Sequence, residues 1–154
     1  MIMTRSDLFK TTIGGARSVS GMAPTFNAIG LAVADMATTL AFYRTLGLDL
    51  PDEMDKEQHA EAALAGGIRL MFDTHELITS FDPGHTPPPG GGTSSLAFLC
   101  ADAAEVDRVH ATMVAAGHAS HLDPFDAPWG QRYATLNDPD GNGVDLFAPL
   151  TTPA

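Results

Sequence analysis

The segment that decides the fold is AIGLAVADMATTLAFYRTLG, residues 28–47. Larger apolar side chains alternate with small ones from Ile29 to Val33, which is the period of a strand with one buried face. Asp35 then stands at the N-cap position of a helix, and Gly47 stands where a helix ends in the left-handed conformation. The segment therefore predicts a strand followed directly by a helix over 36–46.

The same order of signals returns further along the chain. Ser95–Cys100 repeats the strand pattern, Asp102 repeats the cap, and Ala116-Gly117 repeats the helix stop. After a loop with Asp123-Pro124, Pro128 and Trp129, two more strands are predicted around the turn at Asp138-Pro-Asp-Gly141, where Asp, Pro and Gly favour a tight turn. We interpret the chain as an internal duplication and predict an α+β fold of two tandem βαβββ modules.

The composition divides the chain into three parts. Residues 1–22 differ from the rest and are predicted to be an N-terminal tail or a partner-dependent arm. Residues 23–154 are predicted to be a single domain, about the length of one ordinary domain. Within it, module one covers about 25–82, a Pro- and Gly-rich linker loop covers 83–92, and module two covers about 93–150.

The net charge bears on the partners of the protein, and the single cysteine bears on its disulfides and location. The net charge of −11 argues against nucleic acid and against anionic membranes, since both are bound by basic surfaces. Cys100 is the one cysteine, so no internal disulfide forms, and a reducing, cytoplasmic location is expected. No apolar stretch approaches the roughly 18 residues of a membrane span.

Five motifs in this order resemble the vicinal oxygen chelate superfamily, which includes glyoxalase I, extradiol dioxygenases and bleomycin-binding proteins. The motifs are Ile29-Gly-Leu-Ala-Val-Ala-Asp35, Leu40-Ala-Phe-Tyr-Arg44, Trp129-Gly-Gln-Arg-Tyr133, Asp138-Pro-Asp-Gly-Asn142 and Val144-Asp-Leu-Phe147. The resemblance covers nearly the whole chain. It implies two curved mixed sheets that form a cleft, and it implies a homodimer, with the pairing of modules left open.

The resemblance also implies where a metal ion would be held, on the first and last strands of both modules. These positions fall on Ala28, Arg69, Ser95 and Asp145. Asp145 alone is a credible ligand, and the Arg69 guanidinium repels a cation. Because one carboxylate rarely holds a divalent ion, we expect neither a metal nor another cofactor.

The strand alternation predicts which side chains face the cleft. Small residues at Ala28, Gly30 and Ser95 leave volume there, and aromatic planes at its rim suit a flat or cationic organic ligand. Purely structural interpretations stay open as well, among them that Arg69 and Asp145 pair with each other and that Trp129 is a core anchor. The candidate ligand-binding residues are Ala28, Gly30, His59, Arg69, Met71, Ser95, Trp129, Tyr133, Asp145 and Phe147.

Three functions remain open at this point. The first is a metal-independent small-molecule binder, resembling the bleomycin-type proteins that confer antibiotic resistance by sequestration. The second is a lyase or isomerase resembling glyoxalase, in which Asp145 acts as the catalytic base and Arg69 stabilises the oxyanion. The third is an accessory protein with a vestigial cleft. Whether the chain is an enzyme is not decided by its sequence.

Overall fold

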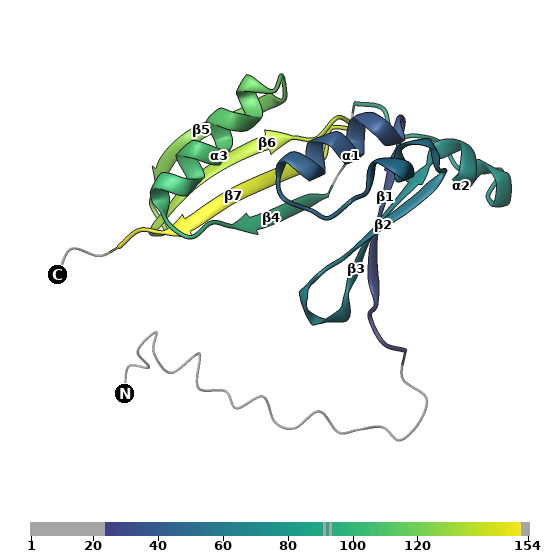
Figure 1. The fold of residues 1–154 in the computed structure, drawn as a ribbon, viewed down its shortest axis with the longest axis horizontal. Coiled ribbons are helices and arrows are strands. Elements are labelled where there is room, and N and C mark those ends of the chain that lie inside the picture. The colour runs from purple at the N-terminus through teal and green to yellow at the C-terminus, as the bar shows by residue number, and fades with distance from the viewer. Residues whose placement is uncertain (1–23, 91, 93, 152–154) are drawn as a thin grey trace, which may run out of the picture.

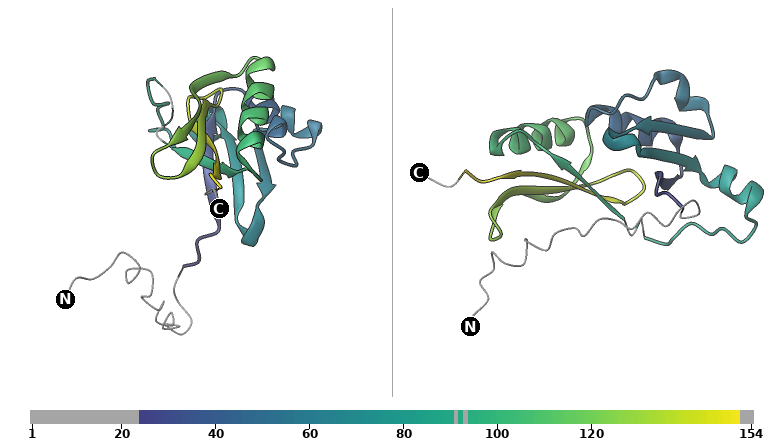
Figure 2. Two further views of the ribbon diagram at one scale, coloured as in Figure 1. Left: turned by 90° about the vertical axis from the view of Figure 1, so that its left-hand side faces the viewer. Right: turned by 90° about the horizontal axis from the view of Figure 1, so that it is seen from below.

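The computed structural model describes residues 24–90, 92 and 94–151, which form two sheets, each covered on one face by a helix (Figure 1). The predicted α+β fold of two modules is confirmed, and the modules lie side by side along the long axis of the molecule (Figures 1 and 2). The predicted N-terminal arm lies outside the described residues. Within those residues, no helix has the length and apolar character needed to cross a membrane.

The first module has a three-stranded sheet of order β1-β3-β2, in which β1 is parallel to β3 and β2 is antiparallel to it. The helix α1 covers this sheet, and α2 follows its last strand. The elements are β1 (Ala28–Val33), α1 (Met36–Thr45), the 3-10 helix η2 (Asp52–Lys56), β2 (His59–Ala63), the 3-10 turn η3 (Ala65–Gly67), β3 (Arg69–Thr74) and α2 (His75–Phe81).

The second module has the complete βαβββ order. Its sheet has the order β4-β7-β6-β5, with β4 parallel to β7 and the other pairs antiparallel. The helix α3 covers one face of it. The elements are β4 (Ser95–Leu99), α3 (Ala103–Ala115), β5 (Ala119–Ala127), β6 (Gln131–Asn137) and β7 (Gly143–Pro149).

The helix signals of the sequence act as predicted. The Asp35 carboxylate accepts a hydrogen bond from the Thr38 backbone N–H at 2.8 Å, and the Asp102 carboxylate accepts one from the Glu105 N–H at 2.8 Å. Both bonds satisfy a backbone donor that has no partner inside its helix. Gly117, just beyond α3, has a φ of 92°, the left-handed conformation that favours glycine at this place.

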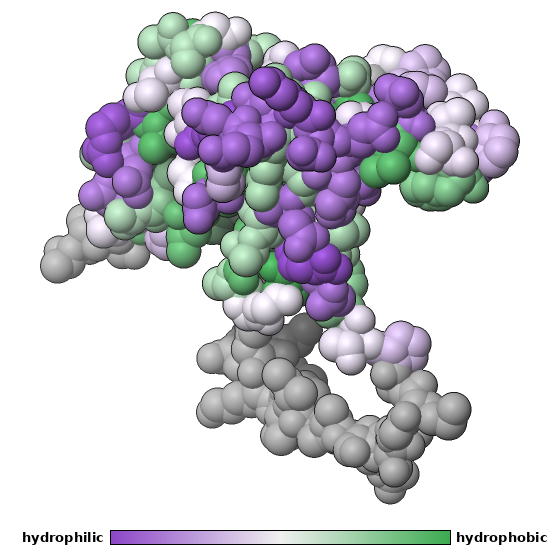
Figure 3. Space-filling model, turned by 45° about the vertical axis from the view of Figure 1, so that its right-hand side comes forward, coloured by the Kyte–Doolittle hydropathy of each residue, from purple (hydrophilic) through white to green (hydrophobic). Residues whose placement is uncertain are grey.

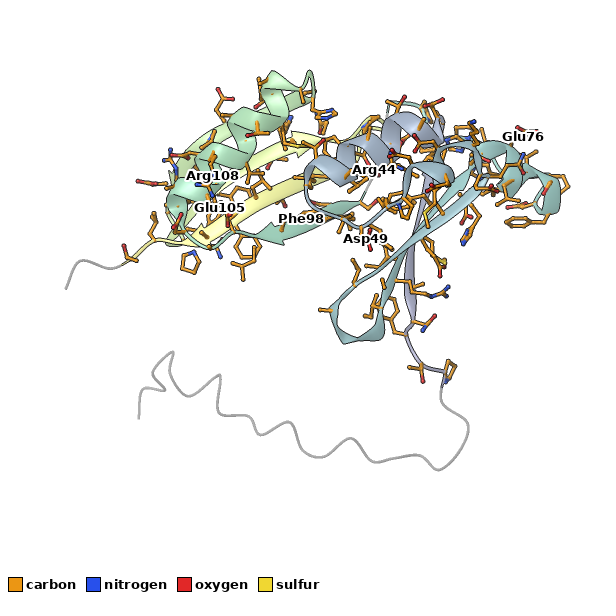
Figure 4. All side chains as sticks on the ribbon, viewed as in Figure 1. Arg44, Asp49, Glu76, Phe98, Glu105 and Arg108 are labelled. Atoms are coloured by element: carbon orange, nitrogen blue, oxygen red, sulfur yellow. The ribbon has the colours of Figure 1, made fainter. Side chains whose placement is uncertain are left out.

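The first module departs from the second between α1 and β2, where it has η2 instead of a fourth strand. Arg44 near the end of α1 (labelled in Figure 4) holds this connection through several contacts. Its guanidinium donates to the Leu50 carbonyl, to the Pro51 carbonyl at 2.9 Å and to the Asp55 carboxylate at 2.7 Å. These contacts fold the connection against the helix.

Strand β5 lies in a segment that the sequence predicted to be a loop around Asp123 and Pro124. The strand pairs with β6 but shifts register between Ser120 and Leu122 and again between Leu122 and Phe125. Such bulges accommodate a proline, which donates no ladder hydrogen bond. The loop prediction was therefore wrong, since turn-forming residues here interrupt the ladder without ending the strand.

The turn at residues 138–141 of module two carries two carboxylates that accept hydrogen bonds from module one. The Tyr43 hydroxyl donates to Asp138 Oδ2 at 2.8 Å, and the Thr39 hydroxyl donates to Asp140 Oδ2 at 2.6 Å. Asp140 Oδ1 also accepts from the Ala34 N–H at 2.8 Å. Burial raises the pKa of the Tyr43 phenol, and the Asp138 carboxylate raises it further, so the phenol stays neutral and donates. The turn therefore helps to set how the two sheets lie relative to each other.

Candidate functional site

Each sheet has one face covered by its helix and one open face, and the alternation of side chains is as predicted. Leu31, Val33, Leu70 and Phe72 are buried beneath α1. The predicted site residues divide between the two open faces. Ala28, Gly30, His59, Arg69 and Met71 belong to the open face of the first sheet. Ser95, Tyr133, Asp145 and Phe147 belong to that of the second sheet, with Trp129 on the β5–β6 connection.

The open face of the first sheet carries a chain of alternating charges. His59 Nδ1 lies 2.6 Å from Asp73 Oδ1, and His59 Nε2 lies 3.5 Å from Glu61 Oε2. Arg69 donates to Glu61 Oε2 at 2.6 Å and, with two further nitrogens, to Asn27 Oδ1. The hydrogen bond to Asp73 raises the pKa of His59. Figure 3 shows hydrophilic side chains over α1 and η2 and in a strip that runs down this module.

Arg69 and Asp145 each have partners within their own sheet. Arg69 pairs with Glu61, whereas Asp145 accepts hydrogen bonds from the Ser95 hydroxyl at 2.9 Å and the Thr135 hydroxyl at 2.8 Å. The suggestion that Arg69 and Asp145 form an ion pair was therefore wrong. The sequence could place both residues on open strand faces, but it could not identify the neighbours that neutralise or solvate them.

An aromatic cluster stands on the open face of the second sheet. The ring centroids of Trp129 and Tyr133 are 5.4 Å apart, and those of Phe125 lie 6.2 and 6.0 Å from them, all edge to face. Trp129 is 60% exposed, so it is not the core anchor that remained open from the sequence. Its indole N–H donates to Gln131 Oε1 at 2.9 Å, which holds the ring in place.

Tyr133 connects this aromatic cluster to the carboxylate. Partial burial and the neighbouring Asp145, through a hydrogen bond and its charge, together raise the pKa of the Tyr133 phenol to about 12. The phenol is therefore neutral at physiological pH and serves as a donor. The open face thus presents three aromatic rings and, beside Tyr133, one carboxylate that accepts hydroxyl hydrogen bonds.

The residues at the family's metal positions do not fit a divalent ion. Ala28 has no ligand atom, Arg69 carries a positive charge, and both Asp145 oxygens accept hydroxyl hydrogen bonds. Over the ranges that the structure describes, no group of three or more His, Cys, Asp and Glu side chains could hold a metal ion. A divalent ion needs several converging oxygen or nitrogen ligands, and this set of donors does not supply them.

Two cavities lie next to these faces. One, of about 580 Å³, lies where the modules meet, and its lining includes Gly30, Ala32, His75 and Asp140. The other, of about 540 Å³, lies along β4 and is mostly aliphatic. Of the predicted residues, Gly30 lines the first cavity and Ser95 the second. The sequence did not predict the second cavity, because Leu48 and Leu64, which help to form it, belong to connections between elements.

Comparison with known proteins identifies the family. The model of the glyoxalase/bleomycin resistance protein/dioxygenase superfamily matches residues 25–146, and the chain belongs to this superfamily. A comparison with curated proteins gives no significant match.

Similar solved structures come from several bacteria. A glyoxalase/bleomycin resistance protein/dioxygenase from Nocardioides is 26% identical, with 88% of this chain and 89% of that chain covered and a TM-score of 0.67. A glyoxalase-related enzyme from Fulvimarina pelagi is 20% identical, with 82% and 88% covered and a TM-score of 0.69. A lactoylglutathione lyase from Agrobacterium tumefaciens is 22% identical, with 82% and 95% covered and a TM-score of 0.59. The last two similarities concern the fold alone.

Proposed function

We propose that this protein binds a small, flat, cationic organic molecule against the open face of the second sheet, without a protein-bound metal. The observation that carries the proposal is the exposed Trp129, packed edge to face with Tyr133 and Phe125 on the face that carries Asp145. By analogy with bleomycin-binding members of the superfamily, the biological role would be sequestration, for example of an antibiotic.

The chemistry of this face suits such a ligand. An aromatic plane attracts a cation by about 0.5–1 kcal/mol when exposed and about 2 kcal/mol when desolvated. Asp145 supplies one negative charge, and the net charge of −11 draws cations toward the surface. Binding of this kind needs shape, stacking and charge complementarity, and it needs no activated group.

The enzyme alternative has less support. In that mechanism Asp145 is the base and Arg69 stabilises a developing enolate oxyanion. The Arg69 charge is already neutralised by Glu61 at 2.6 Å, and both oxygens of Asp145 accept hydroxyl hydrogen bonds. Each residue would have to leave its partners before it could act on one substrate.

We also propose that the protein is a homodimer in the cytoplasm. The open faces of the two sheets lie in different modules of the chain, so a second copy would enclose a ligand better than one copy does. Light scattering coupled to size exclusion tests this, with a mass of twice 16.1 kDa as the expected result and the monomer mass as the contradicting one.

The direct test is a calorimetric titration with planar and glycopeptide antibiotics, paired with a protection assay on cells that express the protein. We expect at least one cationic aromatic compound to bind, and Trp129→Ala to weaken its binding about 2- to 30-fold, the loss of one cation–π contact. Phe81→Ala is the matched control, since Phe81 is 70% exposed on α2, outside this face.

A second matched pair tests the charge. Asp145→Asn should weaken cationic ligands, whereas Asp73→Asn, a carboxylate on the other sheet, should not. No binding and no protection across a broad panel would contradict the proposal, as would equal affinity of wild type and Trp129→Ala.

A further inference from the structure

The aliphatic cavity lies along β4, an edge strand of the second sheet, on the side toward the first module. Its volume of about 540 Å³ falls within the range of about 300–1,000 Å³ that is usual for small-molecule sites. Figure 4 labels Phe98 on this strand and Asp49 in the connection across from it. The lining residues are Ile29, Leu48, Leu64, Leu70, Ser95, Leu96, Ala97, Phe98 and Leu99.

The chemistry of the lining selects an aliphatic occupant. Apart from Ser95, every lining side chain is apolar, and Phe98 is the single aromatic one among them. Leu99 is 68% exposed, and Ile29, Leu48 and Leu64 are partly buried at the edge of the core. Apolar surface that stays in contact with water favours the entry of an apolar group.

A carboxylate neighbours two residues that line the cavity. Ser95 lines the cavity, and its hydroxyl donates to Asp145 Oδ2 at 2.9 Å. Ala97, another lining residue, is the register partner of Asp145 on β7. Among the described residues, Asp145 forms no ion pair, and its oxygens accept only from hydroxyl groups, so no cation of the chain balances its charge.

We infer that this cavity binds the aliphatic part of an amphiphilic amine whose ammonium group lies at Asp145. The inference rests on the proposed function, because it adds an aliphatic subsite to the same carboxylate. It narrows the ligand class to flat cationic molecules that also carry an alkyl chain.

The test is a series of n-alkyltrimethylammonium salts, from hexyl to dodecyl, titrated by calorimetry below their micelle concentrations. The affinity should rise about fourfold for each added methylene until the cavity is full. The n-alkyl sulfates of equal length should bind at least about tenfold more weakly, since they place a negative charge at Asp145. An affinity that does not depend on chain length, or sulfates that bind as well as the ammonium salts, would overturn the inference.

Matched variants locate the site. Ala97→Trp places bulk in the cavity from an exposed strand position and should abolish the dependence on chain length. Ala119→Trp makes the same change on β5, the opposite edge strand, and should leave that dependence intact. Leu99→Asn, at an exposed lining position, is the second variant and should reduce the affinity of the longer chains if Ala97→Trp does not fold.

The result also separates this inference from the proposed function. If flat aromatic cations bind in a manner sensitive to Trp129→Ala while alkyl chains add no affinity, the aliphatic subsite is wrong and the proposed function stands. If a dimer forms, the cavity must remain accessible within it. A stable dimer that binds no alkyl chain would show that a second copy fills the cavity, and it would overturn the inference.

Discussion

Tyr43→Phe removes one hydroxyl at the junction of the two modules and leaves the ring in place. Tyr43 is fully buried, and its hydroxyl donates at 2.8 Å to Asp138, which is itself only 4% exposed. Asp138 keeps three other bonds, from the Asp140 N–H and from the N–H and side-chain amide of Asn142. A hydrogen bond to a charged group contributes about 1.5–3 kcal/mol, so we expect Tyr43→Phe to lower the free energy of unfolding by about 2 kcal/mol.

The assay is equilibrium unfolding in urea, with the slope checked so that a change of midpoint reports stability. At about 2–4 °C per kcal/mol for a chain of this size, the melting temperature should fall by about 4–8 °C. Thr39→Val should act in the same direction, since its hydroxyl bonds Asp140 across the same junction at 2.6 Å. Thr45→Val is the matched control on the same helix, because the Thr45 hydroxyl bonds the Ala41 carbonyl of its own helix.

The control should change stability by less than about 0.5 kcal/mol, as exposed substitutions usually do. If Tyr43→Phe and Thr39→Val cost no more than Thr45→Val, the turn does not hold the modules together, and the reasoning is refuted.

Three further predictions concern titration and backbone conformation. The hydrogen bond to Asp73 raises the pKa of His59 in the folded protein. The stability that His59 contributes is therefore complete below about pH 6.5 and is lost as the pH rises through the pKa of the folded state. In Asp73→Asn, the midpoint of the His59 titration measured by NMR should move to lower pH. The phenol of Tyr133, with a pKa of about 12, should not ionise near pH 10 in the folded protein, and Asp145→Asn should lower this pKa in an ultraviolet absorbance titration. Gly117→Ala should destabilise by about 1–2 kcal/mol in urea unfolding, because φ at this position is 92°.

Local signals in the sequence predicted much of the fold. The alternation from Ile29 to Val33 and the caps at Asp35 and Asp102 depend on residues within a few positions of one another. Such signals act on their own segment, so the first strand, both long helices and the duplication followed from them. The last strand followed as well, because it lies directly after the turn at 138–141.

Features that depend on contacts between residues far apart in the chain could not be predicted from the sequence. His110 is only 7% exposed and bonds Ser120, because β5 packs against that face of α3, and the sequence of the helix alone does not reveal this contact. The sequence placed Arg69 on an open strand face correctly, but its pairing with Glu61 depends on the register between β2 and β3. The aliphatic cavity depends on how two modules meet, which neither module encodes alone.

The central claim is that the aromatic face of the second sheet binds its ligand without a metal. Trp129 is the one tryptophan of the chain, so its fluorescence reports on this face alone. The measurement is a fluorescence titration with the best cationic compound of the panel, first in the presence of a chelator and then with added zinc, nickel or manganese. We predict the same saturable change and the same Kd in every condition. A response that appears only when a divalent metal is present, or no response at all, would contradict the account.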